Sequence, residues 1–203
     1  MKKLDRREVV LYSAAVGHRR RSVSSSYVHR TSSKVQSVNR NQKVVIVAAT
    51  YNEKFTTPLL ENCLEELEEN APFLEVEVLR VPGAFEVPVM VKRAIASPSG
   101  QVPNVIIGLG VILRGSTAHA DLIGAAITNQ LLSIACVTLT PVIHEVLLLS
   151  DEKQAFSRCV ASSLNRGREA ARAAMSMLNL VEEQDSAALR ARRIAAASNG
   201  SLF

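Results

Sequence analysis

The sequence has no tryptophan, and only 4% of its residues are aromatic, whereas 47% are hydrophobic. The core that it can form is therefore built mainly from aliphatic side chains. No charged start followed by a short apolar segment is present, so we do not expect a secretory signal. No apolar run reaches the length needed to cross a bilayer, so we do not expect a membrane-spanning protein or a membrane partner.

Cysteine is also scarce. Cys63, Cys136 and Cys159 are odd in number and widely spaced, and each lies among apolar residues. This pattern predicts neither a disulfide framework nor a zinc site, and we expect no metal. We interpret the three residues as buried, reduced thiols, which favours an intracellular compartment.

Acidic residues are nearly absent from the first part of the chain. Of the 24 Lys and Arg residues, 11 lie within residues 1–43, whereas only Asp5 and Glu8 represent the 19 acids there. The remainder holds 13 bases against 17 acids, so the net charge of +5 comes from the first segment and not from the rest. The rest has no basic footprint, and we expect no nucleic-acid partner.

The composition divides the chain into three regions. Residues 1–42 form a basic, Ser- and Arg-rich extension that we expect to be disordered. An organellar transit segment and a nucleic-acid-binding arm remain open alternatives for it. Residues 43–181 form the domain, and residues 182–203 form an Ala- and Arg-rich tail that either prolongs the last helix or frays. We expect a cytoplasmic location, or an organellar one if the extension is a transit segment.

The domain alternates between apolar runs and helical periodicity. The runs predict strands at residues 44–49, 73–81, 104–110 and 140–149. Helices are predicted from Pro58 with Thr57 as cap, over 86–97, over 117–134, after a cap at Ser150 or Asp151, and over 165–181. Four strand–helix alternations predict an α/β fold with a four-stranded parallel sheet and helices on both faces.

Two segments that follow strands carry side chains suited to binding. Tyr51 and Asn52 come directly after the first strand, where an aromatic ring can stack on a flat heterocycle. Residues 81–88 contain two prolines and a glycine, which fix a turn and project Phe85 and Glu86. Taken alone, these are an ordinary exposed tyrosine and a helix-capping turn.

A third segment, residues 110–121, follows the third strand. Gly115, Ser116 and Thr117 before a helix form a typical anion site, and His119 in its first turn can exchange a proton with the bound group. A lone histidine at this position is more often a surface residue. All three segments, however, follow consecutive parallel strands, and open α/β sheets bind ligands at the carboxyl ends of their strands.

With these segments, the chain resembles the 6,7-dimethyl-8-ribityllumazine synthase family of riboflavin biosynthesis. The resemblance runs from about residue 43 to about residue 180 and excludes both tails. It rests on Tyr51-Asn52, Pro82-Gly83-Ala84-Phe85-Glu86, Gly110 through Asp121, Pro141-Val142-Ile143, Gln154-Ala155 with Arg158, Asn165-Arg166-Gly167 and Glu169-Ala170-Ala171.

The resemblance implies a flavodoxin-like three-layer αβα sandwich in a homopentamer or an assembly of pentamers, with sites between neighbouring subunits. The reaction that it implies condenses 5-amino-6-ribitylaminouracil with 3,4-dihydroxy-2-butanone 4-phosphate, releasing phosphate and water, without a cofactor. It makes riboflavin synthase a candidate partner. In a single chain, Arg158 and His144 would then point at solvent beside a half-built site.

The resemblance also implies roles for individual residues. Tyr51 would stack on the pyrimidine, while Phe85 and Glu86 would line the ribityl pocket. Val111 and Ile112 would face the pyrimidine edge. Ser116 and Thr117 would hold the phosphate, with Arg158 reaching it from the adjacent subunit, and His119 would shuttle protons as the catalytic residue. The other substrate-binding residues would be Asn52, Ala84, Gly110, Gly115 and His144.

The chain departs from the family pattern mainly after Ile143, where His144-Glu145 replaces the usual Phe-Gly. Ala120 replaces a common aromatic residue, and residues 160–164 lack the usual glycines and lysine. These departures concern the neighbour's part of the site and the higher assembly. They keep open a second hypothesis, a non-catalytic relative that binds flavin or lumazine or forms a cage. A flavodoxin-type electron carrier is disfavoured, because Thr50-Tyr51-Asn52 stands where its phosphate loop would be.

Overall fold

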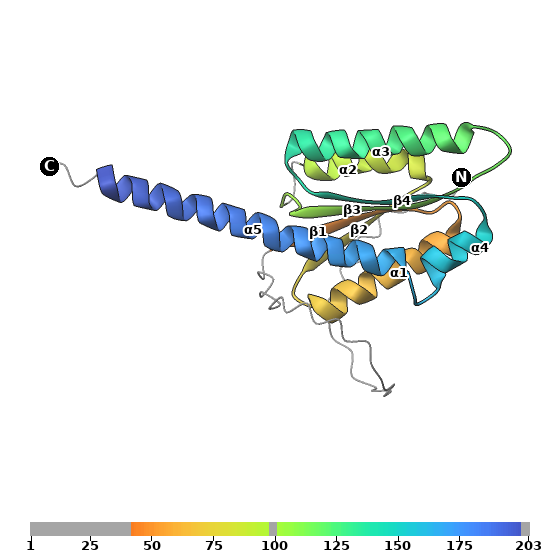
Figure 1. Ribbon diagram of the computed structural model, residues 1–203, viewed down its shortest axis with the longest axis horizontal. Coiled ribbons are helices and arrows are strands. Elements are labelled where there is room, and N and C mark those ends of the chain that lie inside the picture. The colour runs from red at the N-terminus through yellow and green to blue at the C-terminus, as the bar shows by residue number, and fades with distance from the viewer. Residues whose placement is uncertain (1–41, 98–100, 200–203) are drawn as a thin grey trace, which may run out of the picture.

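The computed structural model describes residues 42–97 and 101–199 (Figure 1). The prediction made for the N-terminal extension falls outside these residues, apart from Gln42. The sheet has four strands: β1 Lys43–Ala49, β2 Glu75–Val81, β3 Val105–Leu113 and β4 Val142–Leu149. All neighbours are parallel and the order is β2-β1-β3-β4. The predicted four-stranded parallel sheet is therefore confirmed.

Helices cover both faces of this sheet (Figure 1). On one face lie η1 (Ala84–Glu86), α2 (Val87–Ile95) and α3 (His119–Thr138). On the other lie α1 (Glu53–Asn70), α4 (Glu152–Ala155), the π-helical turn η2 (Phe156–Val160) and α5 (Arg166–Asn199). This is the three-layer α/β sandwich predicted from the sequence.

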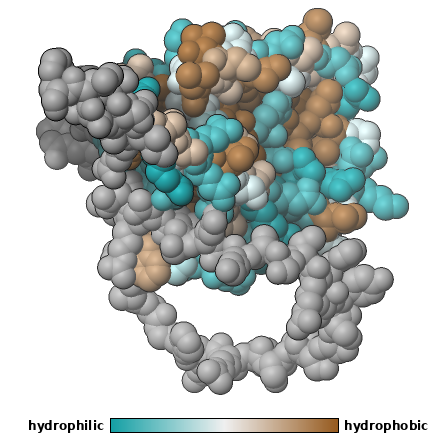
Figure 2. All heavy atoms as spheres, turned by 60° about the vertical axis from the view of Figure 1, so that its left-hand side comes forward, coloured by the Kyte–Doolittle hydropathy of each residue, from teal (hydrophilic) through white to brown (hydrophobic). Residues whose placement is uncertain are grey.

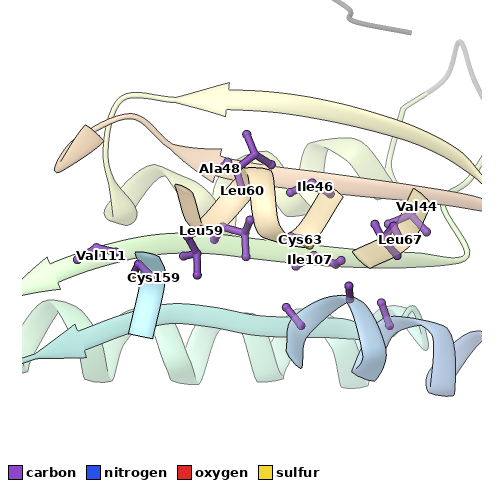
Figure 3. Packing of buried hydrophobic residues seen from close by; sticks show 14 of the residues in the cluster. Val44, Ile46, Ala48, Leu59, Leu60, Cys63, Leu67, Ile107, Val111 and Cys159 are labelled. Atoms are coloured by element: carbon purple, nitrogen blue, oxygen red, sulfur yellow. The ribbon is translucent and has the colours of Figure 1, made fainter. Parts of the chain in front are cut away.

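Each face of the sheet has its own core. Val44, Ile46 and Ala48 of β1 pack toward α1 and α5, where Figure 3 shows them beside Leu59 and Cys63 of α1. The alternate residues of β1 pack toward α2 and α3. A strand buried on both faces must be apolar throughout, which explains the continuous run in its sequence.

The start of α1 was predicted wrongly. The helix begins at Glu53 after Asn52, which has left-handed backbone angles (φ 60°, ψ 43°), so Pro58 lies inside the helix. Pro58 has no N–H to donate to the carbonyl four residues earlier. Proline is therefore most common in the first turn of a helix, where no such bond is needed, and this is why the sequence placed the helix start there. The loss of one hydrogen bond is tolerated because the leucines after Pro58 anchor the helix in the core.

The cysteine prediction is right for two residues and wrong for the third. Cys63 and Cys159 are fully buried, and burial raises the pKa of each thiol to about 12, so neither is a thiolate nucleophile at neutral pH. Cys136 is exposed, because it lies on the side of α3 that turns away from the sheet. Its apolar neighbours in sequence include exposed residues of the same helix, such as Val137.

Among the described helices, α3 is long and apolar enough to cross a membrane, by length and composition alone. The expectation that no segment reaches this length was therefore wrong. One such helix is weak evidence of a membrane span, because core helices of soluble proteins meet the same criterion. In this fold α3 packs on α2 and β4, and Ile127, Leu131 and Ile134 are its buried face.

The last helix is the longest element of the described chain. Of the two alternatives left open for the tail, the structure has the longer helix, since α5 continues unbroken to Asn199. Figure 1 shows the second half of α5 leaving the domain. Gly167 near its start lies so close to α1 that a Cβ atom there would be 2.2 Å from the Leu59 carbonyl oxygen, which explains why this position is glycine.

Candidate functional site

The three candidate segments meet where the strand order reverses. The chain passes from β1 to β2 on one side, and β3 lies on the other side of β1. The carboxyl ends of β2, β1 and β3 lead respectively into residues 82–86, 50–52 and 114–119. Such a switch point is where parallel α/β sheets leave a crevice for ligands.

Backbone hydrogen bonds join the first two segments. Thr50 N donates to the Val81 carbonyl at 2.8 Å, and Tyr51 N donates to the Pro82 carbonyl at 2.9 Å. The Thr50 hydroxyl donates to the Pro82 carbonyl at 3.0 Å as well. The Tyr51 backbone is thereby fixed, while its side chain is 72% exposed and free to stack on a ligand.

Asn52 joins β1 to β3. Its Nδ2 donates to the Val111 carbonyl oxygen at 2.8 Å, while its own carbonyl accepts from Phe55 N and opens α1. Asparagine tolerates left-handed backbone angles better than most residues. Asn52 therefore turns the chain through its backbone and joins the ends of β1 and β3 through its side chain. Asn52 is therefore a positioning residue in this geometry, and its Oδ1 and the second N–H of its Nδ2 are left for a substrate among the described residues.

The turn between β2 and α2 packs directly on β3. A Cβ atom at Gly110 would lie 3.4 Å from the Ala84 Cβ, so Ala84 and Gly110 are in contact. A Cβ atom at Gly83 would lie 2.9 Å from the Glu86 Oε2, so the Glu86 carboxylate lies over the turn. Phe85 is 63% exposed, which leaves its ring available to a ligand.

Not every predicted residue presents a side chain to this edge. Val111 is 2% exposed and packs in the core under α1, so a ligand can reach only its backbone. Ile112 is half-buried on the opposite face, toward α2 and α3. β3 extends three residues beyond its predicted end, to Leu113, and these residues therefore belong to the sheet.

The loop after β3 is exposed and closed by an ion pair. Gly115, Ser116, Thr117 and His119 are all exposed, and His119 is the first residue of α3. The Arg114 guanidinium bonds the Asp121 carboxylate, which joins the end of β3 to the first turn of α3. The loop thus presents its hydroxyls and the positive end of a 20-residue helix to solvent.

Arg158 lies on η2, after α4, whose cap is confirmed as Asp151. It is half-buried, and within residues 42–97 and 101–199 it makes no hydrogen bond or ion pair. A guanidinium without a carboxylate partner is suited to binding an anion from outside the chain.

His144 is not at the carboxyl edge. It pairs in register with Gly108, in the middle of β3, and its ring faces α3. Val146 N donates to its Nδ1 at 3.1 Å, and its Nε2 lies 2.8 Å from the Thr128 hydroxyl. Burial lowers the pKa of His144. The expectation that His144 points at solvent is therefore wrong, because its neutral ring is already hydrogen-bonded.

Glu145 faces the other side of β4 and is buried. Its carboxylate accepts two hydrogen bonds from Arg166, at 2.7 Å and 3.0 Å. Sequence reasoning did not predict this pair, nor the one between Arg114 and Asp121. An available signal was a buried strand position that is acidic, since such a group needs a basic partner.

Comparison with known proteins decides the family. A model of the family described as 6,7-dimethyl-8-ribityllumazine synthase matches residues 41–182. A 6,7-dimethyl-8-ribityllumazine synthase from Thermococcus kodakarensis is 34% identical over 141 residues, covering 70% of this chain and 87% of the relative. One from Thermococcus gammatolerans is 32% identical over 148 residues, covering 73% and 93%.

The chain belongs to the 6,7-dimethyl-8-ribityllumazine synthase family. The match to the lumazine synthase family includes every candidate residue above, from Tyr51 to Arg158. It also includes His144 and Glu145, so these departures lie inside the lumazine synthase domain. It ends at Glu182, and the protruding part of α5 lies outside it.

Proposed function

We propose that this chain condenses 5-amino-6-ribitylaminouracil with 3,4-dihydroxy-2-butanone 4-phosphate, giving 6,7-dimethyl-8-ribityllumazine, phosphate and water. Family membership supports the reaction. The main structural support for the site is the contact between Ala84 and Gly110 together with the Asn52 bond to Val111. These two contacts join the carboxyl ends of β2, β1 and β3 into one binding edge. The chemistry needs no resident cofactor.

The exposed groups at this edge suit the two substrates. The Tyr51 ring offers a face for the pyrimidine, and Phe85 with Glu86 offers an apolar wall and a carboxylate for the ribityl chain. The loop at Ser116 and Thr117 offers hydroxyls and helix amides for the phosphate. His119 moves protons during imine formation and phosphate loss. Holding two substrates together supplies much of the acceleration, up to ~7–11 kcal/mol in favourable cases.

A complete site needs a second copy of the chain, and we propose a homopentamer or an assembly of pentamers. The layer formed by η1, α2 and α3 exposes large apolar side chains, among them Phe85 (63%), Leu122 (69%), Leu132 (64%) and Val137 (80%). Figure 2 shows hydrophobic surface over this layer, which lies at the top of the view. A groove of about 330 Å³ between α2 and α3 is lined by Phe85, Val89 and Ile134, among others. Exposed apolar surface of this kind marks an interface.

In such a ring each site combines residues from two copies. Arg158 of one copy would reach the phosphate that Ser116 and Thr117 of the next copy hold, which agrees with its lack of a partner within the described residues. Light scattering should then give at least a pentamer. A monomer near 22.0 kDa would contradict both the assembly and the shared site.

A subunit-mixing experiment tests the shared site. Arg158→Ala should raise the Michaelis constant for the phosphorylated substrate and barely change pyrimidine binding. His119→Ala should mainly lower turnover, within the ~10²–10⁴-fold range of proton transfer and toward its lower end. When equal amounts of the two variants are unfolded and reassembled together, about a quarter of the sites in a ring regain both residues.

Recovery of that fraction of wild-type turnover at limiting phosphorylated substrate supports the shared site. No recovery, in assemblies that mass spectrometry shows to be mixed, would place both residues in the same subunit's site. If wild-type protein binds the pyrimidine but forms no product, the non-catalytic alternative holds instead.

We propose a cytoplasmic enzyme, or an organellar one if residues 1–42 act as a transit segment, and riboflavin synthase as its partner. Imaging a fluorescent fusion with and without residues 1–42 tests the location. Co-sedimentation with riboflavin synthase, which uses the lumazine product, tests the partner.

A further inference from the structure

The second half of α5 has features that the proposed reaction does not use. Residues 183–199, here called the C-terminal extension, lie beyond the family match and continue the helix away from the domain (Figure 1). Between Glu183 and Arg192 every side chain is exposed except that of Ser186, which is half-buried. Leu189 is 53% exposed, although a large apolar side chain on a solvated helix is normally turned inward.

The charges of the extension are separated along the helix. Acidic residues come first, at Glu183 and Asp185, and basic residues follow at Arg190, Arg192 and Arg193. Ion pairs within a helix need a spacing of three or four residues. The residues three and four places after Asp185 are Ala188 and Leu189, so Asp185 has no arginine at that spacing.

One face of the extension combines these features. Asp185, Ala188, Leu189 and Arg192 follow one another at helical spacing and therefore share a face. Asp185 and Arg192 are two turns apart, about 10 Å along the axis, too far to pair with each other. This face thus has a small apolar centre with an acid on one side and a base on the other.

We propose that this face pairs antiparallel with the same face of a second copy of the chain. In that arrangement Leu189 of each copy lies against Ala188 of the other, and Asp185 of each copy lies opposite Arg192 of the other. A two-fold axis makes the contact self-complementary, so the pairing of Asp185 with Arg192 forms twice, giving two ion pairs in all. Parallel pairing would instead set acid against acid and base against base.

The position of the extension keeps this contact away from the candidate active site. Gln42, which precedes β1, donates from its Nε2 to Glu182 at 3.1 Å. The extension therefore leaves the domain at the amino ends of the strands, whereas the candidate site lies at their carboxyl ends. Pairing joins two domains, or two rings, without covering either site, and it does not depend on the proposed reaction.

Charge exchange in the full-length chain tests the pairing. Asp185→Arg makes the face wholly basic and Arg192→Asp makes it wholly acidic, so each variant alone should lose pairing, with at least a halving of particle mass in sedimentation. The chain that carries both changes should recover the wild-type mass, because its charges are again complementary. An equal mixture of the two single variants should recover it too.

Matched controls lie on the opposite face of the same helix. Glu183→Arg and Arg190→Asp make the same charge changes there, and both should keep the wild-type particle mass. Circular dichroism checks that every variant remains helical, and turnover should equal that of wild type throughout. Raising the salt concentration should lower the wild-type mass, because screening weakens exposed ion pairs.

Two results would overturn the proposal. If Asp185→Arg and Arg192→Asp both keep the wild-type mass, this face does not pair. If both lose mass but the doubly exchanged chain, helical by circular dichroism, stays dissociated, the contact is not the antiparallel one described.

Discussion

Replacing Arg166 with methionine should destabilise the folded chain and make its stability depend strongly on pH. Arg166 donates two hydrogen bonds to Glu145, whose side chain is only 7% exposed. Methionine keeps much of the apolar stem of arginine and removes the charge. The variant therefore leaves the Glu145 carboxylate buried without its partner, while packing changes little.

The size of the effect follows from the burial of the pair. Removing one partner of a fully buried ion pair costs about 3–5 kcal/mol. The Arg166 side chain is 36% exposed, so water screens the pair, and we expect about 2–3 kcal/mol instead. For a domain of this size, 1 kcal/mol corresponds to about 2–4 °C in Tm, so the loss should be about 4–12 °C.

The direction of the pH dependence is fixed by Glu145. Burial raises the pKa of Glu145 above its ordinary value of 4.5, although the hydrogen bonds from Arg166 act to lower it. The folded chain therefore holds a proton that the unfolded chain releases, and stability falls as pH rises from 4.5 through the folded value. Without Arg166 the pKa of Glu145 in the folded chain rises further, so the pH range over which stability falls becomes wider. The difference in Tm from wild type should therefore be largest near neutrality and shrink toward pH 4.5.

The Tm of both proteins is measured over a pH series by thermal unfolding at fixed protein concentration, with circular dichroism as the signal. Arg172→Met is the matched control, because Arg172 is 60% exposed and Glu66 keeps its bond to Arg168 at 3.2 Å. Its loss should be at most about 1 kcal/mol. Equal losses in the two variants, or a loss in Arg166→Met that is constant with pH, would refute the reasoning.

Three other predictions concern the frame of the site and the N-terminal extension. Gly167→Ala should prevent stable folding, since its Cβ would lie 2.2 Å from the Leu59 carbonyl oxygen; soluble yield and circular dichroism check this, and a fully stable variant would contradict it. Asn52→Ala should lower turnover and cost about 1–2 kcal/mol of stability through the lost bond to the Val111 carbonyl; unchanged kinetics would show that this bond does not position the site. Deleting residues 1–35 should leave Tm and activity nearly unchanged, and a large drop in Tm would show that this segment packs on the domain.

The four-stranded sheet and the alternation of strands and helices along the chain could be predicted because local sequence patterns decide them. The continuous apolar run at β1 requires burial on both faces, and each intervening helix has an apolar stripe. The three segments of the candidate site were predicted together for the same reason, since parallel strands bring their carboxyl ends to one edge. Element boundaries were less predictable, as at Pro58, where anchoring by later residues outweighs the local rule.

Pairings between distant residues could not be read from the sequence. The bond from Asn52 to Val111 depends on how β1 and β3 align, and the Arg166–Glu145 pair depends on α5 crossing β4. His144 illustrates the same limit. The resemblance implied that His144 binds substrate in the site shared with a neighbouring subunit, but its strand position directs the ring to Thr128.

Formation of the lumazine by the full-length chain is the most direct test of the proposed reaction. A steady-state assay should supply 5-amino-6-ribitylaminouracil and 3,4-dihydroxy-2-butanone 4-phosphate together and follow the product and the released phosphate. We predict product and phosphate in equal amounts, formed well above the uncatalysed rate in saturable dependence on both substrates. Protein that is folded and binds the pyrimidine, yet forms lumazine no faster than the uncatalysed mixture, would contradict the central claim.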